Sequence, residues 1–121
     1  MNNNQLEYNL CIVLLYATGY DGVISDQELD NMIAILTELF QGIGREDNPL
    51  DYLAAVIEET KLMTPEKLFE HTTTSVLFLK ENLNDKDLRI TFEAVKHAMS
   101  DHTHSEQEVK FLGALSNMWA L

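Results

Sequence analysis

The apolar segment LCIVLLYA, residues 10–17, most constrains what this chain can fold into. Apolar side chains in this region recur at helical spacing and also fill the other helix faces: Leu6, Leu10, Val13, Leu14 and Ala17, together with Ile12, Leu15 and Tyr16. A helix that is apolar nearly all round must be covered on every side. We therefore predict a central helix over residues 5–18, closed by Gly19 in a left-handed conformation. The run is too short to cross a bilayer, which takes about 20 residues.

Helix-start signals divide the rest of the chain into further helices. A capping box is predicted at Ser25, because Glu28 follows three residues later. Comparable signals precede the other helices: Asn48 with Pro49, Thr64 with Pro65, Asn84, and Ser105 with Glu108. No segment alternates with the period of two that indicates a strand. The sequence predicts an all-α, compact single-domain bundle of about six helices over residues 1–121. The predicted inward-facing residues are Leu50, Leu53, Ala54 and Ile57 in the third helix, and Leu68, Phe69, Thr72, Val76 and Leu79 in the fourth.

Composition limits the classes of function. With 121 residues, 45% of them hydrophobic, the chain can bury one core without disulfides. The single cysteine, Cys11, has no partner and is expected in the core of a cytoplasmic protein. The N-terminal residues lack the basic charge of a secretory signal. A formal net charge of -12 opposes nucleic-acid binding and anionic lipid surfaces, and favours cations or basic protein partners. The alternative interpretation is that the negative charge serves only to keep the protein soluble.

The two ends of the chain share a pattern. When Asp21 is superposed on Asp101, similar residues coincide on both sides of the turn: Ser25 with Ser105, Gln27 with Gln107, Glu28 with Glu108, and Leu29 with Val109. Any two capped helix starts look somewhat alike. Agreement in both the preceding and following helices favours two pseudo-symmetric helix-turn-helix units, residues 5–41 and 84–121.

Four carboxylates mark the two turns. Asp21 and Glu28 lie at the ends of the first turn, and Asp101 and Glu108 at the ends of the second. If the units pack symmetrically, these groups would repel one another unless a cation bridges them. Calcium and magnesium prefer such oxygen ligands, so the four residues are the predicted metal site. The alternative is that both glutamates serve only as caps and both aspartates are solvated.

The first turn resembles the second half of an EF-hand loop, since DGVISDQE carries Gly22 at the sharp turn and Glu28 as the closing ligand. The upstream ligand positions are Ala17 and Gly19, which have no side-chain oxygen. A self-sufficient calcium-binding EF-hand is therefore not expected.

Histidines cluster at the second turn. His97, His102 and His104 flank Asp101, and imidazoles with a carboxylate suit zinc or another transition metal. Their spacing matches no established motif, and a polar, exposed turn is the alternative. We treat His102 and His104 as candidate additional metal ligands. His71 stands alone and is expected on a helix surface.

Motifs for catalysis are missing from the sequence. It contains no G-x-S-x-G elbow, P-loop or H-E-x-x-H, and Cys11 is not followed by a paired base. The sequence therefore predicts a protein that is not an enzyme.

The turn YDGVISDQE after an apolar helix, echoed by SDHTHSEQE near the end of a helical chain, resembles the TerB-like tellurite-resistance family. The resemblance implies a helical domain whose acidic turns bind a divalent metal cation. It also implies a role in tellurite resistance, chemical stress or phage defence, with protein partners in stress-response or membrane-associated complexes. By matching position, Asp21 with Glu28 and Asp101 with Glu108 are the implied acidic pairs. The sequence departs from the family where His102 replaces the expected glycine.

Overall fold

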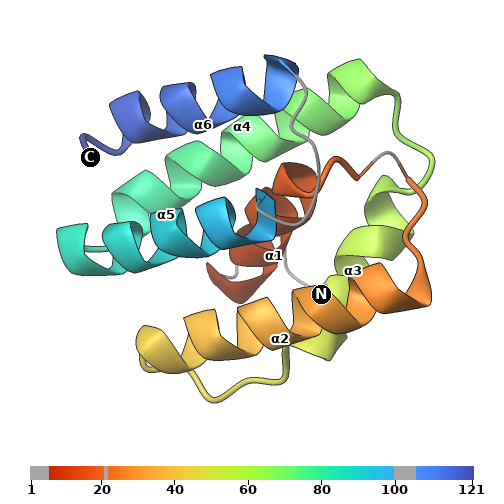
Figure 1. The fold of residues 1–121 in the computed structure, drawn as a ribbon, viewed down its shortest axis with the longest axis horizontal. Coiled ribbons are helices and arrows are strands. Elements are labelled where there is room, and N and C mark those ends of the chain that lie inside the picture. Colours follow the sequence, from red (N-terminus) through yellow and green to blue (C-terminus); the bar gives the residue numbers. More distant parts are fainter. Residues whose placement is uncertain (1–5, 21, 100–105) are drawn as a thin grey trace.

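The computed structural model describes residues 6–20, 22–99 and 106–121, without the side chains of residues 107 and 108. In these ranges the chain forms six α-helices and no strand: α1 (Leu6–Ala17), α2 (Asp26–Gly42), α3 (Pro49–Thr60), α4 (Pro65–Asn82), α5 (Asp85–Met99) and α6 (Glu106–Met118). Figure 1 shows them as a bundle in which α1 lies inside. The predicted all-α fold is confirmed. The twofold relation between its two helix pairs stays a prediction.

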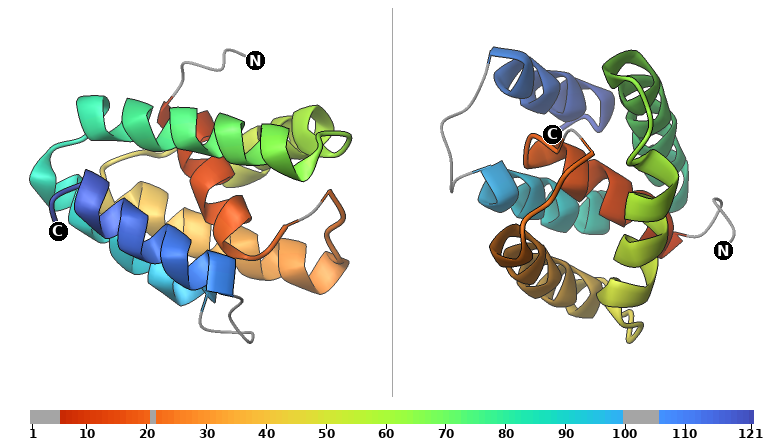
Figure 2. Two further views of the ribbon diagram at one scale, coloured as in Figure 1. Left: turned by 90° about the horizontal axis from the view of Figure 1, so that it is seen from above. Right: turned by 90° about the vertical axis from the view of Figure 1, so that its right-hand side faces the viewer.

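Helix α1 is the centre of the core. It packs against α2, α3, α4 and α5, and Figure 2 shows it enclosed by these helices from two further directions. From Glu7 to Leu15 no residue is more than 6% exposed. Each large apolar side chain buried in this way contributes about 1.5–3 kcal/mol relative to an exposed one. Gly19, at φ 81°, ends the helix region as predicted.

The predicted caps are present at four helix starts. Ser25 forms the capping box of α2, and the side chains of Asn48 and Thr64 accept backbone N–H bonds at the starts of α3 and α4. At α5, the Asn84 side-chain oxygen accepts from the backbone N–H of Asp87 at 2.8 Å. Each such bond satisfies a backbone donor that the helix leaves free. The predicted cap of the sixth helix, Ser105, lies outside the described residues.

The inward face of α3 differs in part from the prediction. Leu53 is buried and Ile57 partly buried, as predicted, whereas Leu50 and Ala54 are exposed. Two further residues, Val56 and Thr60, are buried without having been predicted. A count of apolar residues missed the last of these because threonine is polar. The Thr60 hydroxyl is satisfied in the core, where it lies 2.7 Å from the Val56 carbonyl and 3.1 Å from the hydroxyl of Tyr20. The buried stripe of α3 therefore keeps Leu53 and is completed by Val56 and Thr60 instead of Leu50 and Ala54.

Phe69 was also expected in the core and is 52% exposed. On α4 the buried positions are Leu68, Thr72, Ser75, Val76 and Leu79. The Phe69 ring instead packs at 62° to that of Tyr16, with 6.2 Å between ring centroids. Phe69 therefore lies at the edge of the core, beside α1.

Helix α2 ends in a turn that attaches the α2–α3 loop to α1. Gly44, at φ 80°, allows the Arg45 backbone N–H to reach the Phe40 carbonyl at 2.8 Å, which is a Schellman closure. Arg45 then lies 3.5 Å from the Glu7 carboxylate of α1. Burial and a hydrogen bond with Asp47 raise the pKa of Glu7.

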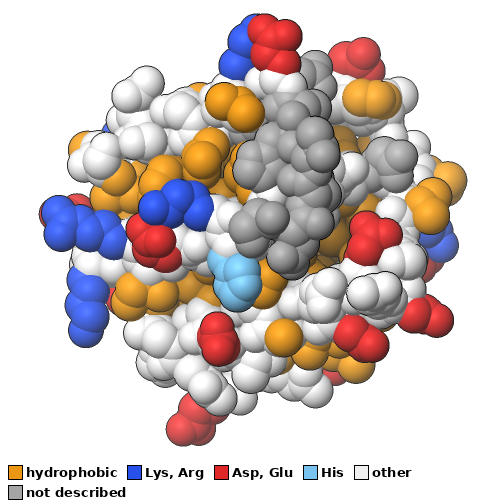
Figure 3. All heavy atoms as spheres, in the orientation of Figure 1, with side chains coloured by type: hydrophobic (Ala, Val, Ile, Leu, Met, Phe, Trp, Pro, Cys, Tyr) orange, Lys and Arg blue, Asp and Glu red, His pale blue; other side chains and the backbone are white. Residues whose placement is uncertain are grey.

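Helix α6 is anchored at its C-terminal end. The Trp119 indole N–H donates to the Val76 carbonyl of α4 at 3.1 Å, and the Trp119 side chain is buried. Figure 3 shows hydrophobic side chains in the gap between α5 and α6 and again between α5 and α2. Among the described helices, none is long and apolar enough to cross a membrane.

Candidate functional site

The first turn is held against the α3–α4 loop by a close backbone approach. Gly22 has φ 108°, and a Cβ atom added there would lie 2.8 Å from the carbonyl oxygen of Lys61. Next to it, the hydroxyl of Tyr20 bonds that of Thr60, and Tyr20 is 7% exposed. Glycine is therefore required at this position by both the backbone angle and the available space.

Glu28 lies in the first turn of α2, where it completes the capping box. Its backbone N–H donates to Ser25 Oγ at 3.1 Å, and its Oε1 accepts from the Ser25 backbone N–H at 3.4 Å. The second contact is long for a hydrogen bond. The Glu28 side chain is exposed, so its carboxylate keeps free lone pairs for another ligand.

A cavity of about 430 Å³ lies beside this capping box. It is lined by residues from the end of α1, the start of α2 and the end of α5: Thr18, Ser25, Gln27, Glu28, Asn31, Met32, Ile35 and Ala98. Five of these side chains carry oxygen atoms, and one is a carboxylate. Packing of α5 against both α1 and α2 brings the three helix ends together. The cavity thus joins the first turn to the helix that precedes the second.

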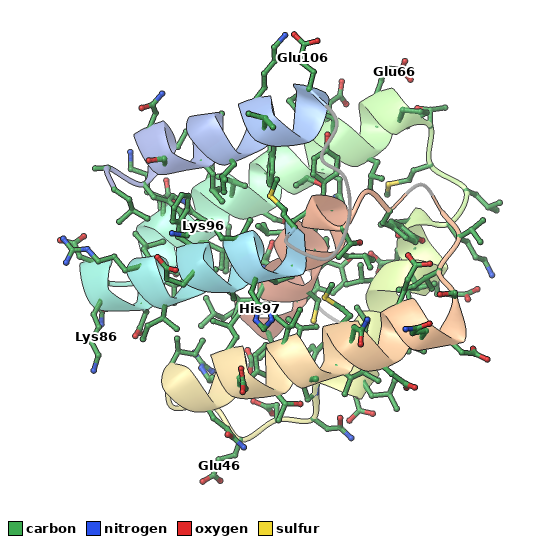
Figure 4. The ribbon with its side chains drawn as sticks, in the orientation of Figure 1. Glu46, Glu66, Lys86, Lys96, His97 and Glu106 are labelled. Atoms are coloured by element: carbon green, nitrogen blue, oxygen red, sulfur yellow. The ribbon has the colours of Figure 1, made fainter. Side chains whose placement is uncertain are left out.

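The other predicted ligands belong to parts of the chain beyond the described ranges. Asp21, Asp101, His102 and His104 lie outside the described residues, as does the side chain of Glu108. Across the part of the chain that the structure does describe, no group of three or more potential metal-binding side chains occurs. His97 is exposed on α5, on the side that faces α2 (Figure 4).

Cys11 is fully buried in the core, as predicted. Burial raises the pKa of its thiol, with a further contribution from the charge of Glu7. A buried, neutral thiol is a poor nucleophile because the thiolate is the reactive form.

A part-buried polar cluster between α1, α3 and α4 was missed by the sequence reasoning. The Tyr8 hydroxyl donates to the Glu59 carboxylate and lies 3.4 Å from Nε2 of His71. Burial, followed by the Glu59 hydrogen bond, raises the pKa of Tyr8. The partners are 51 and 63 residues away from Tyr8 in the sequence, so no local pattern could indicate the cluster. His71 is thus half-buried rather than a free surface residue.

Comparison of the chain with protein-family models, with curated proteins and with solved structures finds no match. The chemistry of the site is therefore inferred from its own residues.

Proposed function

We propose that the protein is a cytoplasmic, non-enzymatic TerB-like domain that binds a divalent cation at its acidic turns and acts in a tellurite, chemical-stress or phage-defence assembly. Asp21, Glu28, Asp101 and Glu108 are the proposed ligands. One observation carries the proposal: Glu28 of the first turn and Ala98, which precedes the second turn, line the same cavity. The all-α arrangement is also the one that the family resemblance implies.

The oxygen atoms around the cavity suit a hard cation. Thr18, Gln27 and Asn31 add neutral oxygens to the Glu28 carboxylate. Calcium takes six to eight oxygen ligands and magnesium six, usually including water. A cation held here would draw the ends of α1, α2 and α5 together. This would let metal binding change the surface that a protein partner meets.

Calorimetric titration with calcium, magnesium, manganese and zinc tests the proposal. Glu28→Gln is the informative variant, because glutamine at this position still supports a capping box but removes the charge. Asp30→Asn is its matched control, since Asp30 is an exposed carboxylate of the same helix outside the cavity. We expect Glu28→Gln to weaken binding at least about tenfold, which corresponds to about 1.4 kcal/mol, and Asp30→Asn to leave it nearly unchanged. The proposal is wrong if none of the four ions binds at millimolar concentration, or if both variants bind like the parent.

A second candidate function is an acidic interaction module without a metal. The observation in its favour is that Ser25 and Glu28 form both halves of the capping box, so the Glu28 carboxylate already has a structural role. The excess of 20 acidic over eight basic residues would then serve to bind a basic partner. A lysine-rich peptide is a suitable probe. This function predicts that peptide binding weakens as the salt concentration rises from about 50 mM to about 500 mM, because salt screens exposed charges. It also predicts that a metal chelator has no effect on peptide binding.

A further inference from the structure

A second cavity, of about 380 Å³, opens between α4 and α6, beside Tyr16 of α1. Its lining includes the buried aliphatic residues Val76 and Leu115, each 1% exposed. Aromatic rings from three helices complete it, with Tyr16 of α1 packed between Phe69 and Phe111. Figure 2 shows α4 and α6 side by side above the end of α1. The cavity is therefore an apolar pocket whose base is formed by buried residues of the core.

The dimensions of the pocket fit a small molecule. Its lining spans residues 69–76 of α4 and 110–118 of α6, about two helical turns or roughly 12 Å on each. A stable protein interface engages about 20–30 residues on each side, which is far more than this surface offers. Pockets for small ligands have volumes of about 300–1,000 Å³ and a mainly apolar lining with few polar groups. A small ligand with an apolar body is thus the better match.

A lysine side chain in the pocket lining indicates that the ligand is anionic. Lys110 lines the pocket, and no carboxylate does so among the residues that the structure describes. Its Nζ atom lies 3.4 Å from Glu106, and both side chains are exposed, at 74% and 86%. Such an exposed pair contributes only about 0–1 kcal/mol, so Lys110 can exchange this partner at little cost. In Figure 4, Glu106 points away from the ribbon at the start of α6.

We propose that this pocket binds a small amphiphilic monocarboxylate, whose hydrocarbon or aromatic body enters between α4 and α6 and whose carboxylate pairs with Lys110. This site is independent of the proposed cation site, because the two cavities share no lining residue.

The protein contains its own reporter for this site. Trp119 is the single tryptophan, and its indole N–H bonds the carbonyl of Val76, a residue of the pocket lining. Decanoate is the probe, with butyrate and decanol as comparisons that lack the long apolar chain and the charge, respectively. We expect decanoate to change Trp119 fluorescence with a 1:1 stoichiometry confirmed by calorimetry. Butyrate should have no effect at the same concentration.

Two pairs of variants separate the apolar from the ionic contribution. Ala114→Phe fills the pocket from an exposed position and should weaken decanoate binding at least about tenfold. Gly113→Phe is the matched control, since a Cβ atom at Gly113 meets nothing within 4 Å. Lys110→Gln should weaken decanoate binding about three- to tenfold and leave decanol binding unchanged, whereas Lys80→Gln should affect neither. Thermal unfolding confirms that each variant is folded.

The proposal is overturned if Ala114→Phe binds decanoate as well as Gly113→Phe does. It is equally overturned if decanoate binds at several sites per chain, or only with concentration-dependent association of the protein, since both indicate surface adsorption. If Lys110→Gln weakens decanol as much as decanoate, the assignment of the carboxylate to Lys110 is wrong.

Discussion

Replacement of Gly22 by alanine tests the claim that the first turn is built around a close backbone approach. A residue with a Cβ atom at φ 108° costs about 1–3 kcal/mol. The added atom would also lie 2.8 Å from the Lys61 carbonyl oxygen, which is backbone and cannot rotate away. Reduced freedom of the unfolded chain offsets about 0.4–1 kcal/mol of this cost. The shift needed to relieve the clash costs about 1–3 kcal/mol more. We therefore expect a net loss of about 2–4 kcal/mol, a large part of the 5–15 kcal/mol typical of a domain.

Gly44→Ala is the matched control. Gly44 also has a positive φ, of 80°, but an added Cβ atom would have no neighbour within 4 Å. Only the backbone strain remains there, so we expect a loss of about 1 kcal/mol. Since unfolding entropy is about 2.1 cal/mol/K per residue, a chain of 121 residues loses about 4 °C in Tm for each kcal/mol.

Chemical denaturation of the two variants, with thermal unfolding alongside, gives the comparison. The reasoning predicts that Gly22→Ala is at least about 1 kcal/mol less stable than Gly44→Ala, with Tm lower by about 4 °C or more. Equal destabilisation of the two would refute it, because the contact between Gly22 and Lys61 would then contribute nothing beyond the backbone angle.

Three further changes probe other parts of the fold. Ser25→Ala removes the side-chain half of the capping box with Glu28 and should lower the free energy of unfolding by about 0.5–2 kcal/mol, measured by urea denaturation. Gly113→Ala lies in α6 with open space around its Cβ position, and should raise Tm because alanine favours the helix by about 0.5–1 kcal/mol. Because folding raises the pKa of Glu7, the stabilisation that this residue contributes is fully present at pH values below its ordinary pKa of 4.5. That stabilisation declines as the pH rises through the higher pKa of the folded state. Glu7→Gln should therefore lose stability relative to the parent most strongly near pH 4, and a parent-to-variant difference that grows with rising pH would contradict this sign.

Local signals predicted the helix starts, whereas the packing between helices needed the structure. A cap such as Ser25 or Asn48 involves residues two or three positions apart, so its chemistry is visible in the sequence. The burial of Thr60 depends on Tyr20, 40 residues earlier, and an apolar count could not detect it. The exposure of Phe69 depends on how α1, α4 and α6 pack together, which the sequence of α4 alone does not determine.

For the candidate sites, too, local features could be predicted from the sequence and tertiary arrangements could not. The prediction that Glu28 caps α2 is confirmed, but a ligand set drawn from two distant turns depends on tertiary geometry and stays a prediction. The pocket between α4 and α6 was not foreseen, because its lining residues look like ordinary core positions. The feature that reveals the pocket is a half-exposed phenylalanine, Phe69, that lines it together with a lysine, Lys110.

The central position of α1 also sets the order in which the chain can fold during synthesis. It is the first of the described helices to be made, and its most extensive packing is against α4, which ends at Asn82. At about 5–20 residues per second, a ribosome takes roughly 3–13 seconds to pass from the end of α1 to the end of α4. During that interval only α2 and α3 are available to cover the most hydrophobic segment of the chain, and the side that α4 covers stays exposed. We therefore expect the nascent chain to be most prone to aggregation before its fourth helix emerges.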